Sequence, residues 1–344
     1  MERIERHLAR LYERTFGAPP VRILPMDGGG SGRQRFRLEG KGPPVIGVGN
    51  DHREENAAFI GFSRHFRSIG LPVPEIFAED PGGGVYLETD LGDHTLADRI
   101  AAGGEPEDGS PSILDLCKEA VRTLPRFQVL GGKGLDFSLC YQGEEFDEEA
   151  MRRDLDYFRD CFLGPFYVGP VRRDRLDEDF RALAHRLAGE ERTTFLYRDF
   201  QPRNILVVMG RLFFVDYQSG RRGALPYDIA SFLTSASAPS GAGVGEALLA
   251  AYLAEIEKMM PFDRGRFLGA YPGFVLIRRL QALGAYGNLG VQKGKEWFLG
   301  KIPRALQCLK DLLEDESLFA GLPELADVLE RLTEAPNSLK VPFR

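Results

Sequence analysis

The first pattern in the chain is helical. Ile4, Leu8 and Leu11 recur at intervals of three and four residues, and this spacing places apolar side chains on one face of an amphipathic helix. At 35–38, arginine alternates with apolar residues, so the arginines share one face of a predicted strand. Residues 45–48 are apolar throughout and predict a second strand.

A second helical pattern follows the predicted strand at 45–48. Asp51 and Glu54 have the spacing of a capping box, which predicts a helix start. The apolar stripe of this helix consists of Phe59, Phe62, Phe66 and Ile69. Glu55 lies one turn before Phe59 and is expected to point with the stripe. Gly70 ends the helix, and Pro72 follows it.

The order of elements predicts the fold class. Short strands are expected at 75–79 and 85–88, so the first ninety residues contain two strands, a helix and two more strands. A polar, glycine-containing break follows, and helical patterns dominate from residue 113 onward. We therefore predict a bilobal α+β fold. Its small, β-rich N-terminal lobe with one helix spans 1–90, its larger, mostly helical C-terminal lobe spans 91–344, and the hinge lies at about 88–93.

Composition narrows the class of protein. The 344 residues are 43% hydrophobic and 28% charged, an ordinary globular balance, and the net charge is −7. We expect no nucleic-acid partner, because there is no overall basic charge. We expect no membrane association, because no apolar run reaches the length of a span. The N-terminus is too charged for a secretory signal, and the four cysteines lack CxxC spacing. These features favour a cytoplasmic protein. We expect it to be a monomer or a homodimer.

The segment 193–223 carries the chemistry. Two β-rich runs, 205–208 and 212–215, flank Met-Gly-Arg and predict a hairpin. The loop before the hairpin holds Asp199 and Asn204, and the second strand leads into Asp216. A hairpin returns the end of its second strand to the beginning of its first. We therefore expect Asp216 to lie close to Asn204 and Asp199.

These three side chains predict a phosphoryl-transfer site. Carboxylate and amide oxygens are the ligands that Mg²⁺ prefers, and Mg²⁺ keeps positions open for phosphate oxygens. Phosphoryl transfer also requires a carboxylate that orients the attacking hydroxyl. We assign Asp199 as catalytic base and Asn204 and Asp216 as Mg²⁺ ligands. The structural alternative is that such residues simply form turns and caps, as they commonly do in loops.

The same residues carry a family resemblance. YRDFQPRN (197–204), FVDYQ (214–218) and PYDIASFL (226–233) resemble the aminoglycoside phosphotransferase and choline kinase-like family, which has the protein-kinase-like fold. The resemblance implies Mg²⁺ with ATP or GTP as cofactors and a small-molecule hydroxyl as acceptor. It also implies that Arg198 and Asp228 support the catalytic loop.

Weaker motifs resemble one branch of that family. GGSGRQRFRL (29–38), GLPVPEI (70–76), DLGDHTL (90–96) and Gln218 are similar to bacterial anomeric amino-sugar kinases. This branch phosphorylates the anomeric hydroxyl of N-acetylmuramate and N-acetylglucosamine. Gln201, Arg203 and Gln218 are the predicted substrate-binding residues. Alternative acceptors are an aminoglycoside, homoserine, choline or a nucleoside, and a non-enzymatic alternative is a pseudokinase scaffold.

One departure from the family concerns the nucleotide site. Protein kinases carry a lysine on the strand at 45–48 that holds the phosphates, but Gly47 or Val48 occupies that position here. Either an arginine of 33–37 replaces the lysine or the protein is a degraded kinase. The predicted nucleotide-binding residues are Gly30, Ser31, Arg33, Arg35, Glu55 and Glu88.

Overall fold

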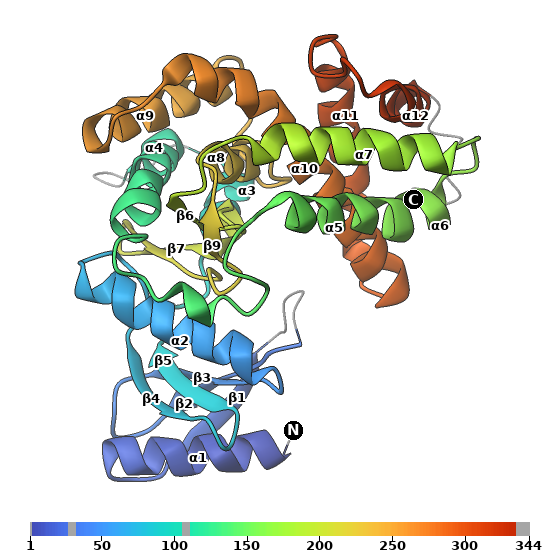
Figure 1. The fold of residues 1–344 in the computed structure, drawn as a ribbon. Coiled ribbons are helices and arrows are strands. Elements are labelled where there is room, and N and C mark those ends of the chain that lie inside the picture. The colour runs from blue at the N-terminus through green and yellow to red at the C-terminus, as the bar shows by residue number, and fades with distance from the viewer. Residues whose placement is uncertain (1, 27–31, 105–110, 335–344) are drawn as a thin grey trace. The chain divides into compact units, whose positions relative to one another are not determined.

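A computed structural model describes residues 2–26, 32–104 and 111–334 (Figure 1). The chain forms two compact units. The first unit comprises 1–144, 197–221 and 239–259, and the second comprises 145–196, 222–238 and 260–344. The predicted lobe boundary at about 88–93 is a different division of the chain and stays a prediction.

An antiparallel five-stranded sheet begins the first unit, with strand order β1-β2-β3-β5-β4. Its strands are β1 (Arg22–Met26), β2 (Gln34–Glu39), β3 (Val45–Gly49), β4 (Ile76–Asp80) and β5 (Val85–Thr89). Helices α1 (Glu2–Phe16) and α2 (Arg53–Ser68) lie on opposite sides of this sheet (Figure 1). The sheet thus has one face toward each helix.

The glycines of β3 bring α1 close to the sheet. Leu8 and Tyr12 of α1 are fully buried. A Cβ at Gly47 would lie 2.7 Å from a methyl carbon of Leu8, and one at Gly49 would lie 2.4 Å from Ile4. Residues alternate across a strand, so Gly47 and Val48, the two candidate positions for the absent lysine, lie on opposite faces of the sheet.

The structure corrects the predicted start of α2. The N-cap is His52, and no side chain caps the helix there, so the predicted capping box of Asp51 and Glu54 is wrong. Instead, the Asn50 side-chain oxygen accepts a hydrogen bond from the His52 backbone N–H at 3.0 Å. Asparagine commonly stabilises a turn in this way, and here it organises the chain before the helix.

Two further differences lie near this sheet. Ile69 follows the last residue of α2 and is 38% exposed, so it does not belong to the buried stripe. Strand β1 was not predicted. It contains Pro25, which lacks the N–H needed for central sheet positions and is tolerated at a sheet edge, where β1 lies.

The remainder of the first unit contains the predicted hairpin. Strands β7 (Ile205–Val208) and β8 (Arg211–Phe214) pair antiparallel. Met209 and Gly210 between them have φ of 48° and 73°, the positive values that two-residue hairpin turns require. The hairpin prediction is therefore confirmed. The other helices of this unit are α3 (Leu96–Ala102), α4 (Ile113–Pro125) and α9 (Val244–Met259).

The second unit is mostly helical. Its helices are α5 (Glu148–Phe158), α6 (Gly164–Phe166), α7 (Arg173–Ala188), α8 (Pro226–Leu233), α10 (Arg264–Gly287), α11 (Ile302–Leu313) and α12 (Pro323–Glu334). Helix α10 packs against α5, α8 and α11 around a large apolar core. A short sheet pairs β6 (Thr194–Leu196) with β9 (Arg221–Gly223). Within the described ranges, no helix combines the length and apolarity needed to span a bilayer. The α+β class is confirmed.

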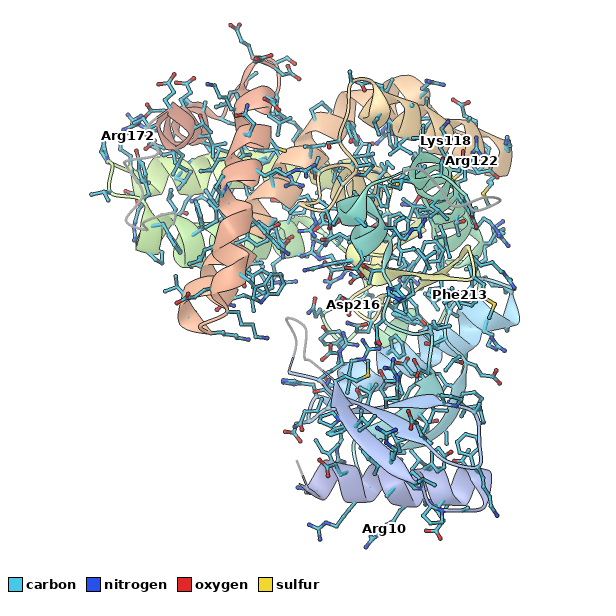
Figure 2. The ribbon with its side chains drawn as sticks, turned by 180° about the vertical axis from the view of Figure 1, so that it is seen from behind. Arg10, Lys118, Arg122, Arg172, Phe213 and Asp216 are labelled. Carbon is cyan, nitrogen blue, oxygen red and sulfur yellow. The ribbon has the colours of Figure 1, made fainter. Side chains whose placement is uncertain are left out.

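Helix α1 provides a test of the packing on β3. Leu8→Ala should lower the free energy of unfolding by about 2–5 kcal/mol, because it leaves a cavity against Gly47 and Leu38. Arg10→Ala in the same helix is the control. Arg10 points away from the sheet (Figure 2), and its replacement should change stability by no more than about 0.5 kcal/mol. Urea denaturation measures both, and equal effects would contradict this account of the packing.

Candidate active site

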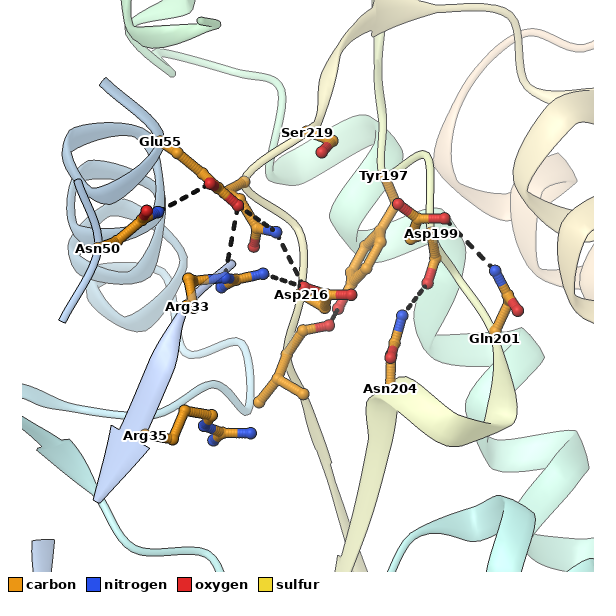
Figure 3. A network of polar contacts seen from close by, with 12 residues as sticks. Arg33, Arg35, Asn50, Glu55, Tyr197, Asp199, Gln201, Asn204, Asp216 and Ser219 are labelled. Carbon is orange, nitrogen blue, oxygen red and sulfur yellow. Dashed lines mark hydrogen bonds and ion pairs between the residues drawn. The ribbon is translucent and has the colours of Figure 1, made fainter. Parts of the chain in front are cut away.

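The hairpin brings the predicted catalytic residues together. The Val215 backbone N–H donates to the Asn204 carbonyl at 3.0 Å, which places Asp216 beside the loop at 199–204. The Asn204 side-chain N–H₂ donates to the Asp199 carbonyl at 2.8 Å. Figure 3 shows these residues in one region of the first unit. The predicted convergence of Asp199, Asn204 and Asp216 is confirmed as geometry.

Two residues of this region have unusual backbone conformations. Arg198 has φ of 78° and Asp216 has φ of 70°. Side chains other than glycine rarely adopt such angles, and residues that keep them cluster at functional sites. One precedes Asp199 and the other is the proposed metal ligand itself. The surrounding contacts must therefore hold both residues in place.

Tyr197 supplies one of these contacts. Its hydroxyl donates to the Val215 carbonyl at 2.7 Å. This bond links the residue before Arg198 to the residue before Asp216, so it joins the two strained segments. Tyr197 is fully buried. Tyr197 therefore has a structural role at this position.

A cluster of aromatic rings connects α2 with both segments. Its members are Phe59, Phe66, Phe127, Tyr197, Phe200, Phe214 and Tyr217. Phe59 stacks on Tyr217 with ring centroids 5.0 Å apart and planes at 5°. Tyr217 and Ser63 of α2 are hydrogen-bonded at 2.5 Å; the Ser63 hydroxyl donates to the Phe59 carbonyl, so Tyr217 is the donor. The residue after Asp216 is thus fixed to helix α2.

Arg33 forms the central ion pairs of the site. Its Nη2 lies 2.5 Å from Oδ1 of Asp216, and its Nε lies 3.4 Å from Oε1 of Glu55 in α2 (Figure 3). We call these three residues the Arg33 bridge. The Arg33 and Glu55 side chains are only 13% and 12% exposed. Shielding from water strengthens such interactions.

Two amides brace the bridge. The Asn50 side chain donates to Oε2 of Glu55 at 2.8 Å. Gln218 donates to Oδ1 of Asp216 at 2.8 Å and to Glu55 at 3.5 Å. Sequence reasoning missed the role of Asn50 and assigned Gln218 only to substrate. The sequence offered one indication for each residue. Asn50 lies two residues before the N-cap of α2, and Gln218 lies two residues after Asp216.

The bridge shifts two pKa values. Burial opposes the charge of Arg33, but Asp216 and Glu55 outweigh it and raise the pKa of the guanidinium. Burial likewise opposes the charge of Asp216, yet Arg33 and the hydrogen bond from Gln218 hold the pKa of that carboxyl below its usual value. Both groups therefore remain charged throughout the physiological pH range.

The two arginines of β2, Arg35 and Arg37, have different partners. Arg35 Nη2 lies 3.4 Å from Oε1 of Glu88 in β5. Glu88 is 3% exposed, and its Oε2 has no hydrogen-bond partner among the described residues. Burial raises the pKa of Glu88, with Arg35 opposing the shift. Arg37 pairs instead with Asp90 and Asp93 at 2.6 and 2.9 Å. Arg33 is thus the arginine that meets the predicted metal ligand.

The remaining predicted residues have varied surroundings. Gln201 is 7% exposed and donates to Oδ1 of Asp199 at 3.4 Å, whereas Arg203 is exposed. Asp228 is fully buried in α8 of the second unit. Gly30 and Ser31 lie outside the described residues. The substrate, nucleotide and loop-supporting roles assigned to these residues stay predictions.

The oxygen donors fit a magnesium ion. Because the Asn204 N–H₂ is bound to a carbonyl, the amide oxygen is the end that remains for a ligand. Arg33 and Gln218 both contact Oδ1 of Asp216 and leave Oδ2 without a hydrogen-bond partner in the described part of the chain. Among the described positions, no group of three or more histidine, cysteine or acidic residues is arranged so that it could hold a metal ion by itself. The set therefore suits Mg²⁺, which takes few protein ligands and completes its shell with phosphate and water.

The chain is similar to known phosphotransferases over most of its length. A family model described as the phosphotransferase enzyme family matches residues 22–262. The N-acetylmuramate/N-acetylglucosamine kinase of Pseudomonas aeruginosa is 26% identical over 93% of this chain and 90% of its own length. A protein of the same name from Caulobacter vibrioides is 26% identical over 76% and 71%, respectively.

Solved structures show the same fold. A choline/ethanolamine kinase family protein from Mesorhizobium loti has a TM-score of 0.61 at 16% identity, covering 94% of this chain and 98% of its own. Choline kinase from Cryptosporidium parvum has a TM-score of 0.56 at 15% identity, covering 90% and 93%. The predicted protein-kinase-like fold is thereby confirmed.

The Tyr197 hydroxyl provides a test of the site's support. Tyr197→Phe should lower the free energy of unfolding by about 1–3 kcal/mol, because it removes the donor from the Val215 carbonyl. The control is Tyr271→Phe, since the Tyr271 hydroxyl has no hydrogen-bond partner in the described ranges. Denaturant titration compares the two. An unchanged midpoint for Tyr197→Phe would show that its bond does not stabilise the fold.

Proposed function

Because the chain belongs to the phosphotransferase enzyme family, we propose that it transfers the γ-phosphoryl group of ATP or GTP to the anomeric hydroxyl of N-acetylmuramate or N-acetylglucosamine. The acceptor is supported by four relatives that carry the name of that kinase. Phosphoryl transfer is supported by one observation: the side chains of four residues lie close together in the first unit, namely Arg33, Asp216, Asn204 and Asp199.

Each residue of the site has a proposed task. Asp199 orients the acceptor hydroxyl and accepts its proton. The side-chain oxygens of Asn204 and Asp216 hold Mg²⁺, which neutralises the phosphate charge that develops during transfer. Glu55 and Asn50 hold Arg33 in position, so its guanidinium is preorganised. Gln201 and Arg203 contact the sugar.

Arg33 takes the place of the absent strand lysine. Val48 in β3 lies opposite Arg35 in β2, and Arg33 comes two residues before Arg35. Arginine binds phosphate oxygens through a planar fork of N–H donors. Its pairing with both Glu55 and Asp216 supports this substitution over the degraded-kinase alternative, since a scaffold has no need of the arrangement. We also propose a cytoplasmic location, in keeping with four free cysteines.

The first test is a phosphate-transfer assay with both sugars. The wild-type protein should consume nucleotide with N-acetylmuramate or N-acetylglucosamine, and ³¹P NMR should place the new phosphate on the anomeric carbon. Asp199→Asn should lower kcat by about 10²–10⁴-fold and still bind Mg-nucleotide in titration calorimetry. If the protein instead phosphorylates choline, homoserine, a nucleoside or an aminoglycoside, and neither sugar, the proposed acceptor is wrong. Nucleotide binding without turnover on any acceptor would favour the scaffold.

The second test concerns Arg33. Arg33→Met should lower kcat/KM for the nucleotide at least about tenfold, because charged hydrogen bonds to phosphate are lost. Arg33→Lys should recover part of the loss, since it restores the charge without the fork. Arg22→Met is the control, because Arg22 is a 60%-exposed arginine on the neighbouring strand. Wild-type kinetics for Arg33→Met would assign phosphate binding to another residue.

A further inference from the structure

A second cluster of arginines lies within the second unit, on helices α10 and α11. Arg278 and Arg279 of α10 are 6% and 2% exposed. Arg304 of α11 is at the surface, where it donates to the carbonyls of Ala236 and Ala238 at 3.0 and 3.2 Å. We call these three residues the α10–α11 arginine cluster. Arginine side chains are rarely buried without a partner.

Arg279 is the member without one. Its Nε is buried and has no hydrogen-bond partner, and no carboxylate pairs with Arg279 in the described part of the chain. Arg278 differs, because its Nε donates to the Ser231 hydroxyl of α8 at 3.0 Å and its Nη1 to Gln281. A guanidinium offers five N–H donors and no acceptor. The Nε–H of Arg279 is therefore a buried donor without an acceptor, on a cation for which the described residues provide no carboxylate.

The neighbours of Arg279 add positive charge. Burial, together with the charges of Arg278 and Arg304, lowers the pKa of Arg279 to about 10. The other groups that influence it are Cys308 and Tyr286. Buried charges in proteins are normally paired or hydrogen-bonded. Arg278 and Arg304 are close enough to act on the charge of Arg279, and guanidinium groups bind carboxylate and phosphate oxygens through charge-assisted hydrogen bonds.

We propose that the α10–α11 arginine cluster is an anion-binding site for a small oxyanion, a carboxylate or phosphate group, with Arg279 as its principal ligand. The serine hydroxyl of Ser231 and the buried Ser235 lie on the segment that Arg278 and Arg304 contact. Hydroxyl groups complement guanidinium groups around oxyanions because both donate hydrogen bonds. A phosphate ligand at this site would be independent of the reaction assigned to the first unit, whereas a substrate carboxylate rests on the proposed acceptor.

Two sources share this ligand chemistry. One is the carboxylate of N-acetylmuramate, which N-acetylglucosamine lacks, and the other is a free phosphate group. Binding of N-acetylmuramate but not N-acetylglucosamine or phosphate would identify a substrate carboxylate. Binding of inorganic phosphate would identify a site for phosphate or a phosphorylated ligand. Both are measured by calorimetry without turnover, so a failure of the proposed enzymatic reaction does not affect the result.

The decisive variant removes the buried charge and keeps the volume. Arg279→Met should raise the melting temperature of the ligand-free protein, because an unpaired buried cation is replaced by an apolar chain. The same variant should lower affinity for the bound oxyanion about ten- to a hundredfold. Arg264→Met, at an exposed position in the first turn of α10, should leave both the melting temperature and the affinity unchanged.

The outcomes that overturn the proposal are equally specific. A wild-type protein that neither phosphate nor N-acetylmuramate stabilises, at ionic strength matched with sodium chloride, has no such site. An Arg279→Met protein with a lower melting temperature and undiminished anion binding assigns Arg279 a purely structural role. If Arg279→Met does not fold, Arg279→Lys replaces it, and this variant should bind the anion more weakly than wild type. Wild-type affinity in that variant also overturns the proposal.

Discussion

The ion pairs of Arg33 with Glu55 and Asp216 determine how the first unit is assembled around its chemistry. One guanidinium joins the start of β2, the first turn of α2 and the segment after β8. Each carboxylate would be costly to bury alone, and the pairing offsets that cost. The geometry of the site therefore depends on three distant parts of the sequence meeting at one side chain.

The aromatic cluster that packs between α2 and these segments also maintains this arrangement. Tyr197 and Tyr217 flank the strained residues, and each anchors its hydroxyl, to the Val215 carbonyl and to Ser63 respectively. Such contacts keep Arg198 and Asp216 in conformations that an unsupported chain would leave. The segments that contain Arg198 and Asp216 are thus held in two ways. The Arg33 bridge holds them by ion pairs, and the aromatic cluster holds them by packing.

Local patterns in the sequence predicted much of this site. Alternation and turn residues predicted the hairpin, and the hairpin alone placed Asp216 beside Asn204. The pairing of Arg33 with Asp216 could not be predicted in this way. These residues are 183 positions apart, and such contacts depend on tertiary packing. The start of α2 was mispredicted for a related reason. Two acidic residues matched the capping pattern, but Asn50 formed the turn and also reached Glu55.

The proposed replacement of a lysine by Arg33 would also change how this protein responds to chemical reagents. A strand lysine presents a primary amine that nucleotide analogues with an acylating phosphate can modify. A guanidinium stays protonated and is a poor nucleophile towards such analogues. Profiling that relies on amine acylation would then overlook the proposed nucleotide site, whereas dicarbonyl reagents selective for arginine would modify it.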